Sequence, residues 1–250
     1  MKSLFNSFDN AVTETLFGLS YAYPQLEYQP AHKVVLIPNL EVRKDKASLI
    51  SGGGAGHEPF AAGFVGNGML TAAVSGCIFS SPTSQKISYA IDRVSLHSKG
   101  QPPMFELKED EIECGMGIHG EAGYEKTKLK SSIEVVSFML KHICDSLSLH
   151  SGDEVAAIIN NFGALSQLEQ GIVVHDLIHQ LRNMNIHPVR IYSGALMTSL
   201  NSAGIHITLL KLPESYKDTF ISCLDEPTNA PQWPGCAYSI PSKNAQSAQS

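Results

Sequence analysis

The chain has 250 residues, of which 43% are hydrophobic and 17% charged, a composition typical of a soluble globular protein. Its formal net charge of −6 offers no basic field, so nucleic acid is not expected as a partner. No apolar run approaches the roughly 18–20 residues that cross a bilayer, and the five widely spaced cysteines suit reduced thiols better than a disulfide framework. We therefore predict a cytosolic protein that binds neither nucleic acid nor membrane.

The first part of the sequence predicts helices alternating with strands. Apolar residues recur at helical spacing between residues 4 and 19 and predict an amphipathic helix. Strands are expected at 32–38, 46–50 and 70–79. The second strand ends in a glycine-rich turn, after which Pro59 suits the first turn of a helix. Ser81 and Pro82 predict the N-cap and first position of a further helix.

The pattern breaks near residues 95–103, SLHSKGQPP, which we interpret as a short linker. Beyond it, apolar residues alternate from Ile112 to Ile118 and predict a strand that leads straight into His119. Ser131 or Ser132 caps the next helix. A strand at 154–159, a helix at 168–181, strands at 189–192 and 205–210 and a helix at 216–224 are then expected. This interleaving predicts an α/β fold with mixed or partly parallel sheets.

Two stretches place a histidine and a glutamate among glycines, SGGGAGHEP at 51–59 and GMGIHGEAG at 115–123. Each follows a predicted strand, and ligands of α/β proteins usually bind at strand ends. Glycines let backbone N–H groups approach a ligand closely, so the amides of Gly54, Ala55 and Gly56 could cradle a phosphate or hydroxyl oxygen. The alternative is that both stretches are tight strand–helix corners. Neither matches a P-loop, because no Gly-Lys-Ser/Thr follows.

Other polar residues have simpler interpretations. His175 and His179 are spaced to share one helical face and could hold a metal, but a solvated face explains them as well, and no metal site is predicted. Cys114 alternates with inward-facing residues and is expected in the core. Asn160 and Asn161 are expected to bond to the backbone in a turn.

Several long motifs resemble one known family. SGGGAGHEPFAAGFVGNGML, FSSPTSQKI, GMGIHGEAG, NNFGALSQLE and ITLLKL closely resemble the substrate-binding K domain of dihydroxyacetone kinases, in particular the ATP-dependent animal type, triokinase/FAD-AMP lyase. The resemblance runs over about residues 1–91 and 105–233. It implies a two-lobed K-domain-like α/β fold with a shortened first lobe. The domains expected are a first part at 1–96, a bridging linker at 97–104, a second part at 105–238 and a disordered tail at 239–250.

The resemblance also implies site residues. The histidine of the GIHGE motif, here His119, would bond through a ring nitrogen to the carbonyl carbon of dihydroxyacetone as a hemiaminal. His57 would hydrogen-bond the substrate and assist proton transfer. Gly54, Ala55 and Gly56 match the substrate-contacting loop, although the family more often has serine at the position of Ala55. Glycerol would be excluded because it lacks a carbonyl.

Two departures from the family pattern limit the expected activity. A middle section with a K-N-Y-T-G-D stretch is missing, as a splice variant or an incomplete gene model would explain. The family's ATP and Mg²⁺ belong to a C-terminal L domain that this sequence lacks, so no cofactor is expected on this chain. The expected partners are dihydroxyacetone or a related short-chain ketose or aldose, an L-type kinase domain and a second copy in a homodimer. The alternative is a non-catalytic module that binds dihydroxyacetone or other proteins.

Overall fold

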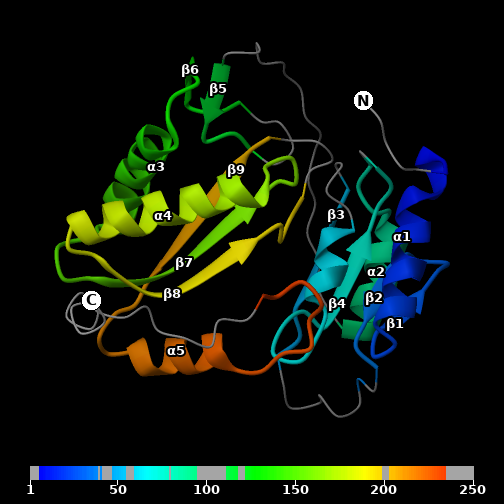
Figure 1. Cartoon of the computed structure of the whole chain (residues 1–250). Helices are drawn as coiled ribbons and strands as arrows, with labels where there is room; N and C mark the ends of the chain where they lie inside the picture. The colour runs from blue at the N-terminus through cyan, green and yellow to red at the C-terminus, as the bar shows by residue number, and fades with distance from the viewer. Residues whose placement is uncertain are drawn as a thin grey trace.

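The computed structural model describes residues 6–38, 40, 47–54, 59–78, 80–94, 111–117, 122–198 and 203–234. They form two lobes that lie side by side, each built on a β-sheet with helices against it (Figure 1). This confirms the predicted two-lobed α/β fold. Among these residues, no helix combines the length and the apolar character that crossing a bilayer requires.

The first lobe contains a four-stranded mixed sheet. Its strands follow the order β1-β2-β4-β3, in which β3 and β4 are parallel and the other pairs are antiparallel. The elements in chain order are α1 (Phe8–Ala22), β1 (Glu27–Gln29), β2 (Val34–Leu36), β3 (Ile50–Gly53), the 3₁₀ helix η2 (Phe60–Phe64), β4 (Ala72–Ser75) and α2 (Ser84–Val94).

Along β2 and the residue that follows it, successive side chains point to opposite faces of this sheet. Val35 and Ile37 pack in a cluster with residues of α1 and η2. Val34 and Leu36 point the other way and pack with Ala90 of α2. All three residues of β2 are buried, as expected for a strand between two helical layers. The central strands of the lobe therefore hold its core.

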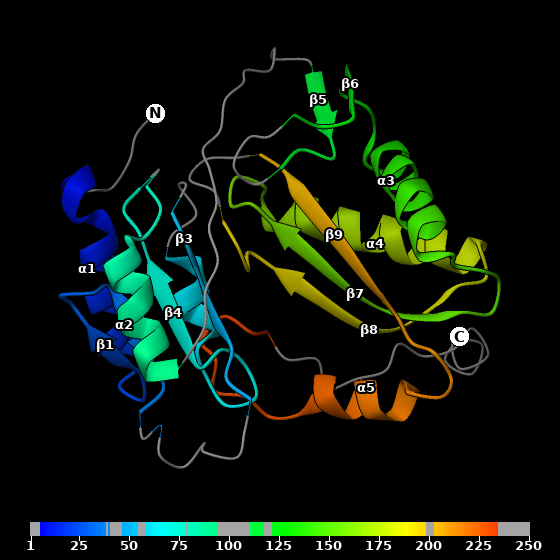
Figure 2. The same cartoon turned by 180° about the vertical axis from the view of Figure 1, so that it is seen from behind.

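The second lobe contains a three-stranded sheet and a separate hairpin. The sheet order is β8-β7-β9, with β8 parallel and β9 antiparallel to β7, while β5 and β6 form the hairpin. The elements are β5 (Glu111–Cys114), β6 (Glu125–Lys128), α3 (Ser132–Leu147), β7 (Glu154–Asn161), α4 (Gln167–Asn183), β8 (His187–Gly194), β9 (Ile205–Lys211) and α5 (Lys217–Asp225). Figure 2 shows this lobe from behind.

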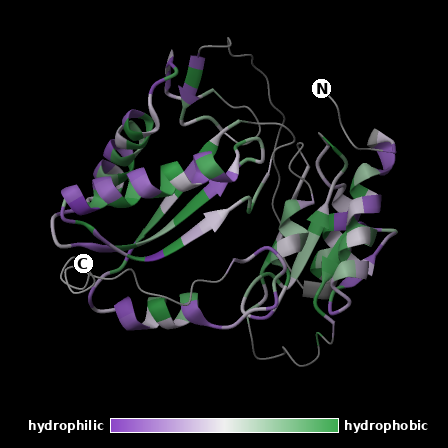
Figure 3. Ribbon diagram, viewed as in Figure 1, coloured by the Kyte–Doolittle hydropathy of each residue, from purple (hydrophilic) through white to green (hydrophobic). Residues whose placement is uncertain are grey.

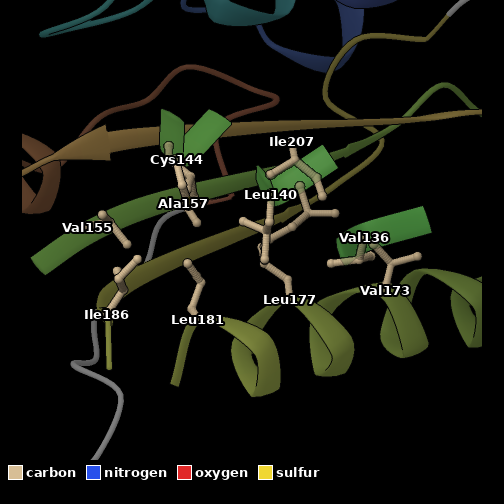
Figure 4. Packing of buried hydrophobic residues seen from close by; sticks show 12 residues of the cluster. Val136, Leu140, Cys144, Val155, Ala157, Val173, Leu177, Leu181, Ile186 and Ile207 are labelled. Carbon is tan, nitrogen blue, oxygen red and sulfur yellow. The ribbon is translucent and has the colours of Figure 1, made fainter. Parts of the chain in front are cut away.

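Helices α3 and α4 cover one face of this sheet and supply half of its core. Leu140 of α3 and Leu177 of α4 lie against β7 and β9 in a cluster of twelve buried residues (Figure 4). Both helices begin with a capping box, formed by Ser131 with Glu134 and by Ser166 with Glu169, which satisfies backbone N–H groups of the first turn. The hydropathy colouring shows apolar residues on the strands and an alternation of polar and apolar residues along α4 and α5 (Figure 3).

Residues 227–234, the C-terminal strap, connect the two lobes after α5. The ring of Trp233 packs on Tyr192 of the second lobe with 4.6 Å between centroids. On the first lobe, the Gln232 N–H donates to the Gly63 carbonyl at 2.9 Å, and the Asn67 N–H donates to the Asn229 side chain at 2.9 Å. The strap therefore contacts both lobes and links one to the other.

Some predicted boundaries were wrong. The strand expected at 46–50 is β3 at Ile50–Gly53, because the glycines predicted as a turn are paired with β4. The N-cap position of α2 belongs to Thr83 and not to Ser81, since the Ile87 N–H donates to the Thr83 carbonyl at 3.1 Å. The strand expected up to residue 118 ends at Cys114. Strands β1 and β6 were not predicted. The linker 97–104 and the tail 239–250 lie outside the described residues.

Candidate functional site

The predicted site residues fall on the two glycine-histidine loops, whose described parts are their ends. Gly54 lies just after β3, the edge strand of the first sheet. Ala55, Gly56, His57 and His119 lie outside the described residues, so the prediction that both loops face one cleft stays a prediction.

The first loop begins where three backbone segments meet with no space for side chains. The Gly76 N–H donates to the Gly53 carbonyl at 2.9 Å. A Cβ atom on Gly54 or on Gly76 would overlap the carbonyl oxygen of Ser80, and one on Gly52 would overlap that of Val74. Only glycine permits such an approach. Gly54 is thus required by backbone packing, whatever it contributes to a ligand.

The second loop is closed at its base by the β5–β6 hairpin. Cys114 pairs with Glu125, and the Tyr124 N–H donates to the Cys114 carbonyl at 3.0 Å. Gly115 leaves the strand with φ +74°, a left-handed conformation that favours glycine. The Tyr124 ring fills the space where a Gly115 side chain would stand. The base of the loop is therefore fixed on both sides.

Glu113 adds a side-chain bond to this base. Its side chain is 1% exposed, and its Oε1 accepts a hydrogen bond from the Gly123 N–H at 2.6 Å. Its Oε2 lies 3.4 Å from the Nζ of Lys126, the residue opposite it in the hairpin. The carboxylate therefore joins the strand before the loop to the last residue of the loop.

A cavity of about 590 Å³ opens beside the first residues of this loop. Gly115, Met116 and Gly117 line one side of it, and α3, α4, the residues after β7 and the start of β9 complete it. Most of its lining is apolar, which suits a small-molecule site with a few polar groups. The lining side chains include Ile112, Glu113, Leu129, Lys130, Val135, Met139, Phe162, Leu165, Glu169, Ile172, Ile205 and His206.

Three lining residues have perturbed pKa values, and the first is Glu169, whose pKa is lowered by the hydrogen bonds from Ser166. The ring of His206 stacks on Phe162, and this partial burial lowers the pKa of the imidazole and favours its neutral form. Burial raises the pKa of the Cys114 thiol, and the nearby Glu125 carboxylate adds to the shift. A thiol held in its protonated form is a poor nucleophile. Cys114 is 8% exposed, which confirms the prediction that it is buried in the core.

The last two residues of β7, Asn160 and Asn161, bond to backbone groups of neighbouring segments. The side chain of Asn160 accepts hydrogen bonds from the Leu196 and Met197 N–H groups at 2.9 and 2.8 Å. Asn161 accepts from the Gly163 N–H at 2.7 Å and donates to the Leu165 carbonyl at 2.7 Å. Both are therefore the backbone-bonding residues that the sequence predicted, and they shape the wall of the cavity next to Phe162.

The histidine pair on α4 does not form a metal site within the described chain. The His175 and His179 rings stack 6.0 Å apart, and His175 contacts the Asp176 carboxylate at 3.0 Å. Nowhere in the described ranges do three His, Cys, Asp or Glu side chains gather as a metal ion would require.

Sequence reasoning missed Glu113, Phe162 and His206 as lining residues. Glu113 and His206 each sit in a strand between apolar neighbours, which predicts a side chain facing away from the core. This alternation predicts which face of the strand each side chain occupies, but it does not predict that a cavity lies against that face.

Comparisons with known proteins agree on the family. A model described as the Dak1 domain matches residues 17–101 and 94–232, so its two parts meet where a middle section is missing. The triokinase/FMN cyclase of Bos taurus is 27% identical over 341 aligned residues, which cover 94% of this chain and 58% of that protein. This chain thus spans less than two thirds of such relatives, and at 250 residues it is shorter than the aligned region itself.

A shorter relative agrees with this family, and solved structures share the fold. The dihydroxyacetone-binding subunit DhaK of a PTS-dependent dihydroxyacetone kinase from Lactococcus lactis is 25% identical, with 93% of this chain and 99% of that protein covered. The dihydroxyacetone kinase of C. freundii has a TM-score of 0.78 at 22% identity, covering 97% of this chain and 62% of that one. The dihydroxyacetone kinase operon co-activator DhaQ has a TM-score of 0.77 at 22% identity, covering 89% and 98%. The chain belongs to the Dak1 domain family and is a K domain that lacks a middle section.

Proposed function

We propose that this chain binds dihydroxyacetone, or a related short-chain ketose or aldose, as the substrate-binding domain of a glycerone kinase. The observation that carries the proposal is the alignment with the Lactococcus subunit, whose name describes it as dihydroxyacetone-binding and which is covered over 99% of its length. The two histidines that the resemblance implicates, His57 and His119, are both present in the sequence. The mostly apolar cavity beside the second loop is of the kind that binds small molecules, which supports the proposal.

The proposed capture step is an addition to the ketone. A ring nitrogen of neutral His119 attacks the carbonyl carbon, a C–N bond forms, and the C=O π electrons move to oxygen. That oxygen takes a proton while the imidazole loses one, so the hemiaminal is a net addition with no leaving group. An unperturbed imidazole, with a pKa near 6.5, is largely neutral at pH 7. His57 would hydrogen-bond the substrate and carry the proton.

The described residues support this step through the loop bases. Gly115 and Gly117, between the end of β5 and His119, carry no side chains of their own, and the hairpin closes the loop with backbone bonds. Holding a nucleophile on a fixed base reduces the entropy that is lost when substrate and nucleophile meet.

Phosphoryl transfer would require a second component. ATP and Mg²⁺ would reside on an L-type domain, and the missing middle section would remove the family's K-N-Y-T-G-D residues from the acceptor side. We therefore propose that this chain does not turn over ATP by itself.

A second candidate function is a non-catalytic module that binds the ketone or a protein partner. It is favoured by one observation, that a protein titled an operon co-activator shares this fold over 98% of its length. The missing middle section also favours a non-catalytic module, because it would remove the family's K-N-Y-T-G-D residues.

Calorimetry and a coupled assay separate these functions. Titration of dihydroxyacetone should give saturable heat, and glycerol should give none, because it has no electrophilic carbon. ATP consumption with magnesium and dihydroxyacetone should appear only when an L-type subunit is added. Binding without turnover in the presence of that subunit would favour the non-catalytic module, and a folded chain that binds no ketone would refute the proposal.

A further inference from the structure

Glu113 is a buried carboxylate in a hairpin that is otherwise partly exposed. Its side chain is 1% exposed, whereas that of Lys126, directly opposite it, is 49% exposed. Burying a charge costs free energy unless hydrogen bonds and an opposite charge compensate it. An apolar side chain would avoid that cost, so the carboxylate is explained better by what it holds than by the stability of the hairpin.

What Glu113 holds is the end of the second glycine-histidine loop. Its Oε1 accepts the Gly123 N–H at 2.6 Å, a charge-assisted hydrogen bond of the strong kind. The fit is close, because a Cβ atom on Gly123 would lie 2.8 Å from the Cγ of Glu113 and would overlap the Cys114 carbonyl oxygen. Gly123 and Glu113 are therefore complementary partners across the base of the loop.

The second oxygen of Glu113 is held more loosely. Its Oε2 is buried and has no hydrogen-bond partner among the described residues, and the ammonium of Lys126 is 3.4 Å away. Glu113 also lines the cavity together with Gly115 and Gly117, the residues that lead into the loop. The carboxylate thus stands where the two ends of the loop and the cavity meet.

We infer that Glu113 is a positioning residue, which fixes the two described ends of the second loop, Gly115–Gly117 and Gly123, for the capture step that is proposed for His119. The inference rests on the proposed function and assigns Glu113 no contact with the substrate. The positioning depends mainly on the hydrogen bond to Gly123, and the ion pair with Lys126 contributes less.

Two substitutions separate the hydrogen bond from the charge. Glu113→Gln keeps an oxygen that can accept the Gly123 N–H, while Glu113→Leu keeps the approximate volume and removes the acceptor. Glu125→Gln, at an exposed position on the partner strand, is the matched control. Thermal melting checks that each variant folds; Glu113→Leu can even gain stability, since a buried charge is removed.

The first measurement is amide hydrogen exchange at Gly123, which does not depend on any ligand. Exchange should be slow in wild type, Glu113→Gln and Glu125→Gln, and at least about tenfold faster in Glu113→Leu, because its acceptor is lost. Equal exchange in Glu113→Leu and wild type would show that Glu113 does not hold the loop.

The second measurement is the dissociation constant for dihydroxyacetone by calorimetry. It should rise about tenfold or more in Glu113→Leu and stay within about threefold in Glu113→Gln and Glu125→Gln. A folded Glu113→Leu variant with wild-type affinity would overturn the positioning role. If wild type itself binds no ketone, the proposed function fails and the positioning role for capture fails with it, while Gly123 exchange still decides whether Glu113 holds the loop.

Discussion

Arg190 is a charged side chain buried in the second lobe, and Asp225 at the end of α5 neutralises it. The Nε and one terminal nitrogen of Arg190 donate to the two carboxylate oxygens of Asp225 at 2.7 and 2.6 Å. A negative charge at the C-terminal end of a helix is unfavourable by itself. The ion pair with Arg190 outweighs this unfavourable effect. The hydrogen bonds from Arg190 lower the pKa of Asp225 below its usual value.

This pair should make the stability of the protein depend on pH. A lowered pKa in the folded state stabilises the fold above the unfolded pKa of about 3.9, and the contribution is lost as pH falls through the folded value. Asp225→Asn should therefore lower the free energy of unfolding at pH 7 by about 1–2 kcal/mol in urea denaturation. The difference from wild type should shrink toward zero below the folded pKa.

Asp218→Asn, in the first turn of the same helix, is the control and should change stability by no more than about 0.5 kcal/mol. A difference between Asp225→Asn and wild type that stays constant down to the lowest pH at which the protein folds would contradict this role for the pair.

At the scale of elements, α4 shows how one helix divides its residues between core and solvent. Leu177 is fully buried in the cluster against the sheet, whereas Leu168 in the first turn is 75% exposed. Leu177→Ala should cost about 2–5 kcal/mol of unfolding free energy, because it removes contacts and leaves a cavity.

Leu168→Ala is the same chemical change on the same helix and should cost less than about 0.5 kcal/mol. Chemical denaturation of the two variants measures both values. Similar losses would mean that α4 does not pack with the face described above.

The helices of the second lobe could be predicted from the sequence because burial repeats along them at helical spacing. The expected helix 168–181 is α4 at Gln167–Asn183, and the cap at Ser131 is the one observed. Strand β6 could not be predicted this way, since only Thr127 among its residues is partly buried and no apolar alternation exists. Its order comes from pairing with β5, a contact that is distant from any local signal.

The residues of the candidate site also divide into those that the sequence could predict and those that it could not. The glycine-histidine loops stand out in the sequence by composition, and the packing around Gly54 shows why a glycine is needed there. Glu113 does not stand out, because its importance depends on Lys126 and Gly123 on the other side of the hairpin. Residues that act through a partner across a hairpin or sheet have no recognisable pattern in a single sequence.

At the scale of the whole molecule, the C-terminal strap joins the two lobes that carry the two loops. Ala230 of the strap is 5% exposed, and a Cβ atom on Gly66 of the first lobe would crowd its backbone nitrogen at 2.6 Å. Trp233 completes the contact on Tyr192. The strap therefore gives the lobes a defined relation, as a site with one loop from each lobe would need.

The central claim is covalent capture of a three-carbon ketone by His119, and NMR of dihydroxyacetone labelled at its carbonyl carbon tests it most directly. With wild type, the carbonyl resonance should move to a tetrahedral position, whereas with His119→Ala it should stay unmoved. His57→Ala should weaken the adduct without abolishing it, because His57 forms no bond to carbon. A folded wild-type chain that leaves the ketone carbon unchanged at high substrate concentration, or an equal shift with His119→Ala, would contradict the claim.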